Sequence, residues 1–162
     1  MKAFKIFLAI LLIIAGLICP TICIVKGVQF DQNCKGYLQQ AADANSPELA
    51  LDRLNKAIEY IEDHNLTSGY TSMFYKTEDE NIGFWYKNII ECREDIKDCL
   101  QSSQLEKTNV LMKVRESLTD TGVTVPLGIY LYPYNRMWCL ARWASYLMII
   151  IGVIGIIAEC ED

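Results

Sequence analysis

Two long uncharged runs, one near each end of the chain, constrain this sequence more than any other feature. Residues 6–25 contain no charged side chain, and neither do residues 143–158. A bilayer core of about 30 Å needs roughly 20 apolar residues in a helix that rises about 1.5 Å per residue. We therefore expect transmembrane helices at 6–25 and 137–158, the second one starting at an interfacial belt of tryptophans beside Arg142.

The first run follows two lysines and could also be the start of a secretory signal. We expect it to be retained, because it is longer than a signal core and no small-residue cleavage site follows it. Residues 1–5 would then form a short N-terminal tail. Residues 159–162 would form a short acidic tail after the second span.

Small residues recur at helical spacing in both runs. Such faces allow close helix approach in membranes, so we expect the two spans to pack as an antiparallel hairpin. Homodimerisation through the same faces is the competing interpretation. The residues are Ala9, Gly16, Cys19 and Cys23 in the first span, and Ala141, Ser145, Met148, Gly152 and Gly155 in the second.

The segment between the spans, residues 26–136, carries most of the charge and has a helical pattern. Apolar residues at spacings of three and four predict that the first helix continues to about Ala44. Ser46 and Pro47 then provide an N-cap and a first helical residue. This next helix should end near His64 and Asn65, where asparagine can adopt a left-handed conformation.

Two further helix starts have the sequence of a capping box, in which a Thr or Ser is followed three residues later by Glu. Thr77 and Glu80 form the first pair, and Ser103 and Glu106 form the second. The helix that begins at Ser103 should end before Gly122. These signals predict an extramembrane bundle of about four helices.

The last part of this segment, from Gly128 to Tyr134, departs from the helical pattern. Its tyrosines alternate with other residues, which is typical of a short edge strand or an extended segment. The expected fold is therefore mainly α: a transmembrane hairpin flanking a helical domain that contains one short extended stretch. An all-helical domain is the alternative.

The sequence offers little support for a catalytic site, a cofactor or metal site, or nucleic-acid binding. A net charge of −5 without a basic stripe argues against nucleic-acid binding. The single histidine, His64, is expected to cap helix carbonyls rather than act as a base. The carboxylates of residues 91–98 alternate with basic residues and are expected to form a solvated face. We assign no catalytic residue, cofactor or metal site, and we find no family whose motifs match residue by residue.

Seven cysteines are present, four of them between the spans or at their edge. Cys92 and Cys99 lie two helical turns apart, about 10 Å by rise, and cannot bridge. Cys34 and Cys139 should both lie just beyond the membrane surface, where a disulfide between them is geometrically allowed. The alternative is that all four are reduced and buried.

Tyrosines on the expected loops are the best candidates for a partner contact, because tyrosine serves well at protein interfaces. We therefore expect a non-enzymatic, membrane-anchored interaction protein whose helical domain binds a membrane or extracytoplasmic protein. The alternatives are a small membrane-surface enzyme or ligand-binding sensor, and a phage-type lysis or exclusion factor. The candidate contacts are Tyr70, Tyr75, Tyr130, Tyr132 and Tyr134.

Two spans place both termini on the same side of the bilayer. Lys2 and Lys5 favour a cytoplasmic N-terminus, whereas basic residues at the ends of the central segment favour the opposite orientation. Long loops are translocated largely regardless of their charge. We therefore expect cytoplasmic termini and an extracytoplasmic central domain.

Overall fold

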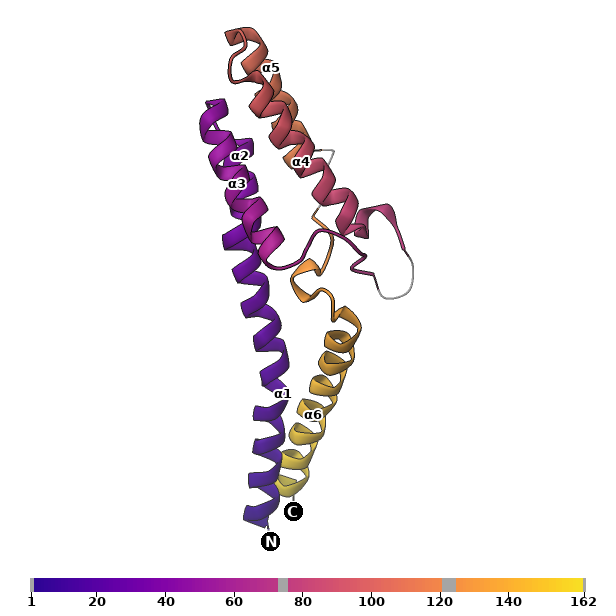
Figure 1. Cartoon of the computed structure of the whole chain (residues 1–162). Coiled ribbons are helices and arrows are strands. Elements are labelled where there is room, and N and C mark those ends of the chain that lie inside the picture. The colour runs from indigo at the N-terminus through magenta and orange to yellow at the C-terminus, as the bar shows by residue number, and fades with distance from the viewer. Residues whose placement is uncertain (1, 73–75, 121–124, 162) are drawn as a thin grey trace. The chain divides into compact units, whose positions relative to one another are not determined.

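The computed structural model describes residues 2–72, 76–120 and 125–161, and excludes the side chains of residues 120, 160 and 161. Over these residues the chain is mainly helical (Figure 1). It forms two compact units. Unit 1 comprises Met1–Gly27 and Pro133–Asp162, and unit 2 comprises Val28–Tyr132.

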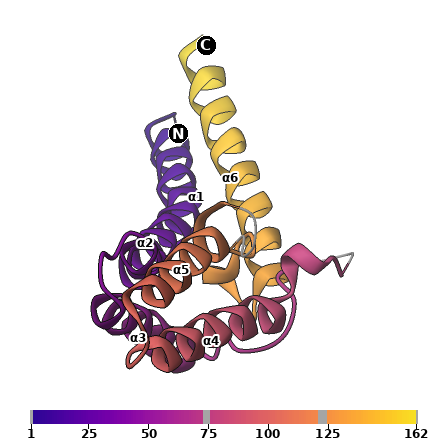
Figure 2. The same ribbon diagram turned by 90° about the horizontal axis from the view of Figure 1, so that it is seen from above.

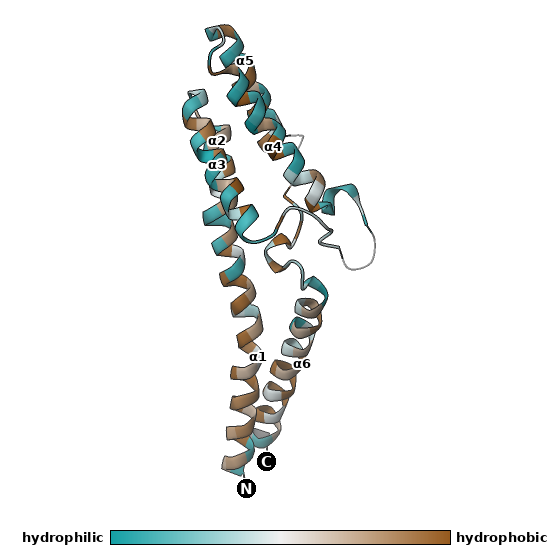
Figure 3. Ribbon diagram, viewed as in Figure 1, coloured by the Kyte–Doolittle hydropathy of each residue, from teal (hydrophilic) through white to brown (hydrophobic). Residues whose placement is uncertain are grey.

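Unit 1 contains the two apolar helices that the sequence predicts. Helix α1 is Lys2–Phe30 and helix α6 is Asn135–Glu161, so both extend beyond the predicted spans. Each is long and apolar enough to cross a membrane. Figure 3 shows the apolar residues concentrated along these two helices, whereas hydrophilic residues are frequent along the helices of unit 2.

Helices α1 and α6 lie side by side and antiparallel (Figures 1 and 2). A Cβ built on Gly16 would lie 2.9 Å from the carbonyl oxygen of Ser145, which shows how closely the two backbones approach. Lys5 forms an ion pair with Glu159 at the end of the unit that holds both termini. At the other end, Lys26 Nζ lies 5.2 Å from the centroid of the Trp138 ring. The predicted small-residue face therefore forms this contact within one chain.

In unit 2 the first helix continues beyond α1 through a π-helical turn, Asp31–Lys35, into α2, Gly36–Ala42. This confirms the predicted extension to within two residues. Helix α3, Pro47–Asp63, begins at Ser46, whose hydroxyl oxygen accepts a hydrogen bond from the amide of Leu49 at 3.2 Å. The predicted N-cap is therefore confirmed, because Ser46 satisfies an amide that the helix itself leaves without a partner.

Helix α4, Ile82–Cys99, starts later than its capping box predicts. Thr77 does donate a hydrogen bond to the Glu80 carboxylate, at 2.8 Å, but this pair only begins a 3₁₀ turn, Glu78–Glu80. The cap of α4 is Asn81, whose side-chain oxygen accepts a hydrogen bond from the amide of Phe84. Two capping signals in succession produce a short turn and then a helix.

Helix α5, Gln104–Arg115, begins at the predicted N-cap Ser103 and is followed by a π-helical turn, Glu116–Asp120. Gly122, the predicted limit of this helix, lies outside the described residues. Helix α2 packs against α3, α3 against α4 and α4 against α5, and α5 in turn contacts α2. Arg115 Nε donates a hydrogen bond to the carbonyl of Ala42, which ties the end of α5 to the end of α2.

The core of unit 2 consists of the inward-facing residues of these helices. Trp85 of α4 is its largest fully buried side chain and lies against the ring of Phe30, at 6.5 Å between centroids. Ile129, from the chain after α5, completes the core, and Leu131 two residues later is also buried. The helices themselves contribute Phe30, Cys34, Leu38, Leu54, Ala57, Ile58, Ile61, Ile82, Ile89 and Ile96.

The predicted short strand or extended segment at Gly128–Tyr134 is wrong. Residues Ile129–Leu131 form a 3₁₀ turn, preceded by Gly128 with a φ of +74°. The alternation is real, since Ile129 and Leu131 are buried while Tyr130 and Tyr132 are half-buried. Nothing pairs with this segment, however, because the described part of the chain contains no strand, only an isolated bridge between Tyr70 and Asn81.

Candidate functional site

The loop between α3 and α4 begins at a tightly closed helix end. His64 Nδ1 lies 2.9 Å from the carbonyl oxygen of Tyr60, and the two rings stack at 4.0 Å between centroids. This geometry confirms that His64 caps a carbonyl. Asn65 has a φ of +55°, in the left-handed region that the sequence predicts. The amide of Leu66, which is buried, donates a hydrogen bond to the carbonyl of Ile61. The loop therefore leaves α3 at a fixed point and direction.

Hydrogen bonds then hold the loop against the start of α4. The amide of Ile82 donates to the carbonyl of Gly69 at 2.9 Å, and the amide of Thr71 donates to the carbonyl of Glu80 at 3.0 Å. Gly69 has a φ of +109°, which favours glycine. The hydroxyl of Tyr132 fills the space beside it, where a Cβ would lie. One predicted tyrosine is thus a packing partner of the loop backbone.

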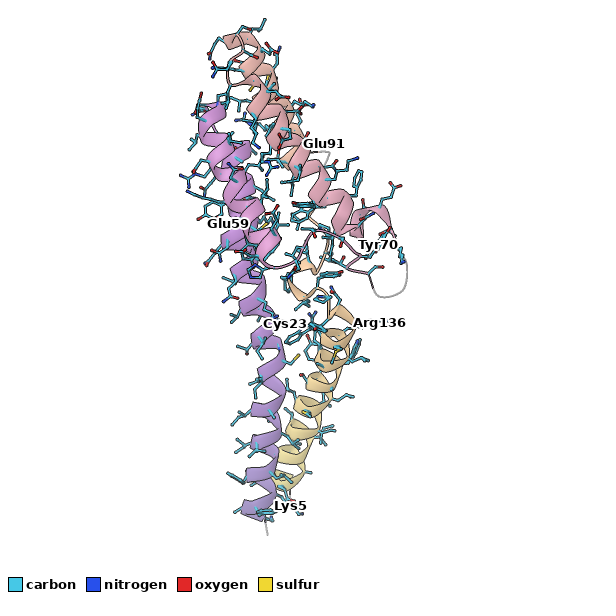
Figure 4. All side chains as sticks on the ribbon, viewed as in Figure 1. Lys5, Cys23, Glu59, Tyr70, Glu91 and Arg136 are labelled. Atoms are coloured by element: carbon cyan, nitrogen blue, oxygen red, sulfur yellow. The ribbon has the colours of Figure 1, made fainter. Side chains whose placement is uncertain are left out.

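Tyr70 is the predicted tyrosine that the loop presents to solvent, with 37% of its surface exposed. Its hydroxyl lies 3.4 Å from Asn81 Nδ2, and Lys76 Nζ lies 5.2 Å from the centroid of its ring. Asn81 also caps Phe84, whose side chain is 54% exposed. We call Tyr70, Lys76, Asn81 and Phe84 the loop surface; Figure 4 labels Tyr70, which projects from the loop.

The other predicted contacts have different positions. Tyr130 and Tyr132 are half-buried against the core of unit 2, whereas Tyr134 is exposed but belongs to unit 1. Tyr75 lies outside the described residues. Of the four described tyrosines, only Tyr70 is both exposed and part of unit 2.

Phe84 was not among the predicted contacts, although the sequence contains a signal for it. Trp85 and Ile89 fix the buried face of α4, and a neighbouring residue on a helix is rotated by about 100°. Phe84 therefore points away from the core. The helical periodicity of the sequence therefore places an apolar residue, Phe84, outside the buried face of α4. Exposed apolar residues of this kind are candidates for partner contacts.

The disulfide that the sequence allows between Cys34 and Cys139 is not present, since both are free thiols. Cys34 is fully buried among the core residues of unit 2, whereas Cys139 is half-buried on α6 of unit 1. Burial raises the pKa of Cys34 to about 12, and burial also raises the pKa of Cys92. These two groups are protonated at neutral pH, and a protonated thiol is a weak nucleophile.

The acidic stretch of α4 is a solvated, ion-paired face, as predicted. Lys113 Nζ lies 2.6 Å from Asp95, and Glu94 pairs with both Arg93 and Lys97. The Lys97 and Arg93 hydrogen bonds lower the pKa of the Glu94 carboxyl. Among the described residues, no group of three or more His, Cys, Asp or Glu side chains could hold a metal ion.

Three of the surface grooves of unit 2 are lined by described residues, and none of these three is lined by His64 or by a predicted tyrosine. The first lies between the α2–α3 turn and α5, the second beside Lys35 and Trp85, and the third between Phe84 and Ser117. The third groove extends from the loop surface along α4 to Asp95 and Lys113. Its ion pair is already satisfied within the protein, so the groove presents no unpaired charge from these two residues.

Comparison with known proteins identifies no relative, since no family model, curated protein or solved structure matches the chain.

Proposed function

We propose that this chain is a non-enzymatic, membrane-anchored interaction protein. Residues 6–25 and 137–158 span the bilayer as a hairpin, and residues 26–136 form a helical bundle that binds a partner protein outside the cytoplasm. The exposed apolar side chains of α1 and α6 support this, because such continuous exposure is unfavourable in water. The close contacts of Gly16 and Gly152 support the hairpin over a homodimer formed through the same faces.

The proposed partner contact rests on the loop surface. Its two aromatic side chains are exposed, yet their backbone is held by the Asn81 cap and by the Gly69–Ile82 hydrogen bond. Interfaces gain most from large aromatic residues that lose little conformational freedom on binding. Lys76 adds a positive charge over the Tyr70 ring.

Site-specific photocrosslinking in intact cells tests this contact. A photoreactive phenylalanine analogue replaces Tyr70 in one full-length variant and Phe84 in another, and Leu105 in a matched control. Leu105 is 73% exposed but lies on α5, away from the loop surface in the sequence. We expect positions 70 and 84 to crosslink the same protein and position 105 not to do so.

The competing outcomes are distinct. Adducts of equal yield at all three positions would show random collision, and adducts with different proteins at 70 and 84 would show that these residues do not form one surface. Either result would contradict the proposed contact. Absence of any adduct at 70 and 84 would do so as well, provided that the variants reach the membrane in the normal amount.

Labelling with a membrane-impermeant maleimide tests the proposed orientation. Leu105→Cys should gain label in intact cells relative to the parent chain, because α5 belongs to the extracytoplasmic domain in our proposal. Lys2→Cys, at the start of α1, should gain label only after lysis. The reverse pattern would place the domain in the cytoplasm, and the search for a partner would move there.

A further inference from the structure

Phe84 belongs to the loop surface and also lines the third groove. The groove continues along α4 through Asn88 and Glu91, which follow Phe84 at spacings of four and three residues and therefore lie on the same face of the helix. Ser117, from the turn after α5, lines the groove as well. The loop surface and the third groove are thus continuous with each other.

The third groove has the size of a partner's side chains rather than of a whole ligand. Its volume is about 280 Å³, whereas small-molecule pockets begin at about 300 Å³ and are usually larger. Phe84, at one end of the groove, leaves 54% of its surface exposed. An aromatic anchor beside a small pocket is the arrangement that protein interfaces commonly use. These features favour a segment of a protein over a small molecule.

The charges beside the loop surface are mostly negative. The 3₁₀ turn Glu78–Glu80 places three carboxylates directly before Asn81, whereas Lys76 is the one cation of the loop surface. Three carboxylates and one lysine give a net charge of −2. Glu78 and Asp79 are exposed, and neither forms an ion pair within the described part of the chain. This negative charge is therefore available to a partner.

Glu91 extends the negative charge into the third groove. Its carboxylate lies 3.7 Å from Lys87 Nζ, and both side chains are more than half exposed. An ion pair in such an exposed position contributes little to stability, so Glu91 can exchange Lys87 for a cation of a partner at small cost. Asp95 and Lys113, which also line the groove, neutralise each other.

We propose that the loop surface and the third groove together bind a basic segment of the partner protein, in which an apolar side chain lies beside lysine or arginine residues. The apolar side chain packs against Phe84, and the cations lie against Glu78, Asp79 and Glu91. An acidic segment or a phosphate group would meet charge of its own sign on this face. The inference rests on the proposed function and adds the chemistry of the partner.

Photocrosslinking from position 84 tests the charge of the partner. Glu78→Gln, Asp79→Asn and Glu91→Gln are introduced singly into the full-length chain that carries the photoreactive analogue at position 84. Because one exposed charge pair contributes little, each variant should lower the adduct yield, per amount of chain in the membrane, about two- to fivefold. Charge reversal by Glu78→Lys together with Asp79→Lys should lower the yield further, because it repels the same segment.

Glu59→Gln is the matched control. Glu59 is an exposed carboxylate of α3 and does not line the third groove, and Figure 4 labels it on a different helix from Glu91. This variant should leave the adduct yield unchanged. Parent-like yields in all the variants of Glu78, Asp79 and Glu91 would overturn the basic partner but leave the partner contact intact. An equal fall in yield for Glu59→Gln would also overturn it, because the effect would not belong to this face.

Mass spectrometry of the adduct provides a second readout, since it locates the partner segment that is attached at position 84. We expect lysine and arginine to outnumber aspartate and glutamate in that segment. A neutral or acidic segment would overturn the inference even if the partner contact is real. Absence of any adduct from the parent chain at position 84 would overturn the proposed partner contact, and the inference with it.

Discussion

Gly152 of α6 faces the backbone of Ala9 of α1 so closely that a Cβ on Gly152 would lie 2.8 Å from the Ala9 carbonyl oxygen and 2.6 Å from Ile13 Cγ1. This is closer than a Cβ is normally found to other atoms. The absence of a side chain at this glycine therefore determines how near the two apolar helices can come. Tight packing of this kind drives helix association where the solvent is as apolar as the side chains.

Gly152→Ala should therefore weaken the hairpin by about 1–3 kcal/mol, because the backbone carbonyl of Ala9 can move only together with α1. Gly155→Ala is the matched control. Its Cβ would lie 3.5 Å from the Ala9 Cβ, an ordinary van der Waals distance. Unfolding in mixed micelles with increasing dodecyl sulfate, followed by circular dichroism, measures both. Equal losses in the two variants would contradict the close approach at Gly152.

Trp85 provides a second test, this time in the core of unit 2. Truncation by Trp85→Ala should cost about 3–5 kcal/mol, since the residue is fully buried. Trp85→Phe should cost clearly less. The indole Nε1 is buried without a hydrogen-bond partner among the described residues, so the smaller ring removes a desolvated donor as well as volume. Urea unfolding of the full chain in micelles, followed by circular dichroism, ranks the variants. A loss for Trp85→Phe as large as that for Trp85→Ala would contradict this expectation.

Gly69→Ala should destabilise the loop that presents Tyr70, by about 2 kcal/mol or more. The φ of +109° strains any residue with a Cβ, and the Tyr132 hydroxyl occupies the space that the Cβ would need. Gly83→Ala, at the second residue of α4, is expected to be neutral or stabilising, because its Cβ meets only ordinary contacts. Limited proteolysis of the loop between α3 and α4 would report the difference. A Gly69→Ala loop as resistant as the parent would argue against this conformation.

The buried thiol of Cys34 should make the free energy of unfolding depend on pH in the alkaline range. Its folded pKa is raised by burial from the ordinary 9.0 to about 12. The contribution of this thiol to the stability of the fold is fully present below the pKa of the unfolded chain. It is lost as the pH rises from about 9 toward 12. The loss is about 1.4 kcal/mol per pH unit for one group. Cys34→Ala should therefore show a shallower decline over this range than the parent.

Tyr86 provides the comparison for that experiment. Its hydroxyl donates a hydrogen bond to Glu62 at 2.6 Å, and this bond is the main cause of its raised pKa. Tyr86→Phe should also reduce the decline, but less than Cys34→Ala, since this pair is largely exposed to solvent. The free energy of unfolding measured in urea at several pH values between 8 and 11 separates the two. A parent-like slope for Cys34→Ala would show that the thiol is not desolvated.

Local sequence signals predicted much of the secondary structure. The two apolar runs, the Ser46 and Ser103 caps and the left-handed Asn65 are all present. Each depends on neighbours within a few residues, so the sequence pattern is sufficient to identify it. The strand prediction failed because strands need a partner, and alternation alone cannot show that one exists. The Thr77 capping box failed because Asn81, four residues later, provides the cap for α4.

The candidate site depended on tertiary contacts more than the secondary structure did. The sequence identified five tyrosines of equal standing, but burial against the core separates Tyr130 and Tyr132 from Tyr70, and Phe84 joins Tyr70 only through the shared contact with Asn81. In the same way, Cys34 could be a disulfide partner by its place in the sequence, yet it is buried within its own unit. Composition and periodicity determine which segments are helical and which are apolar. Whether a given side chain is covered or exposed depends on residues distant in sequence, and only the packed structure decides it.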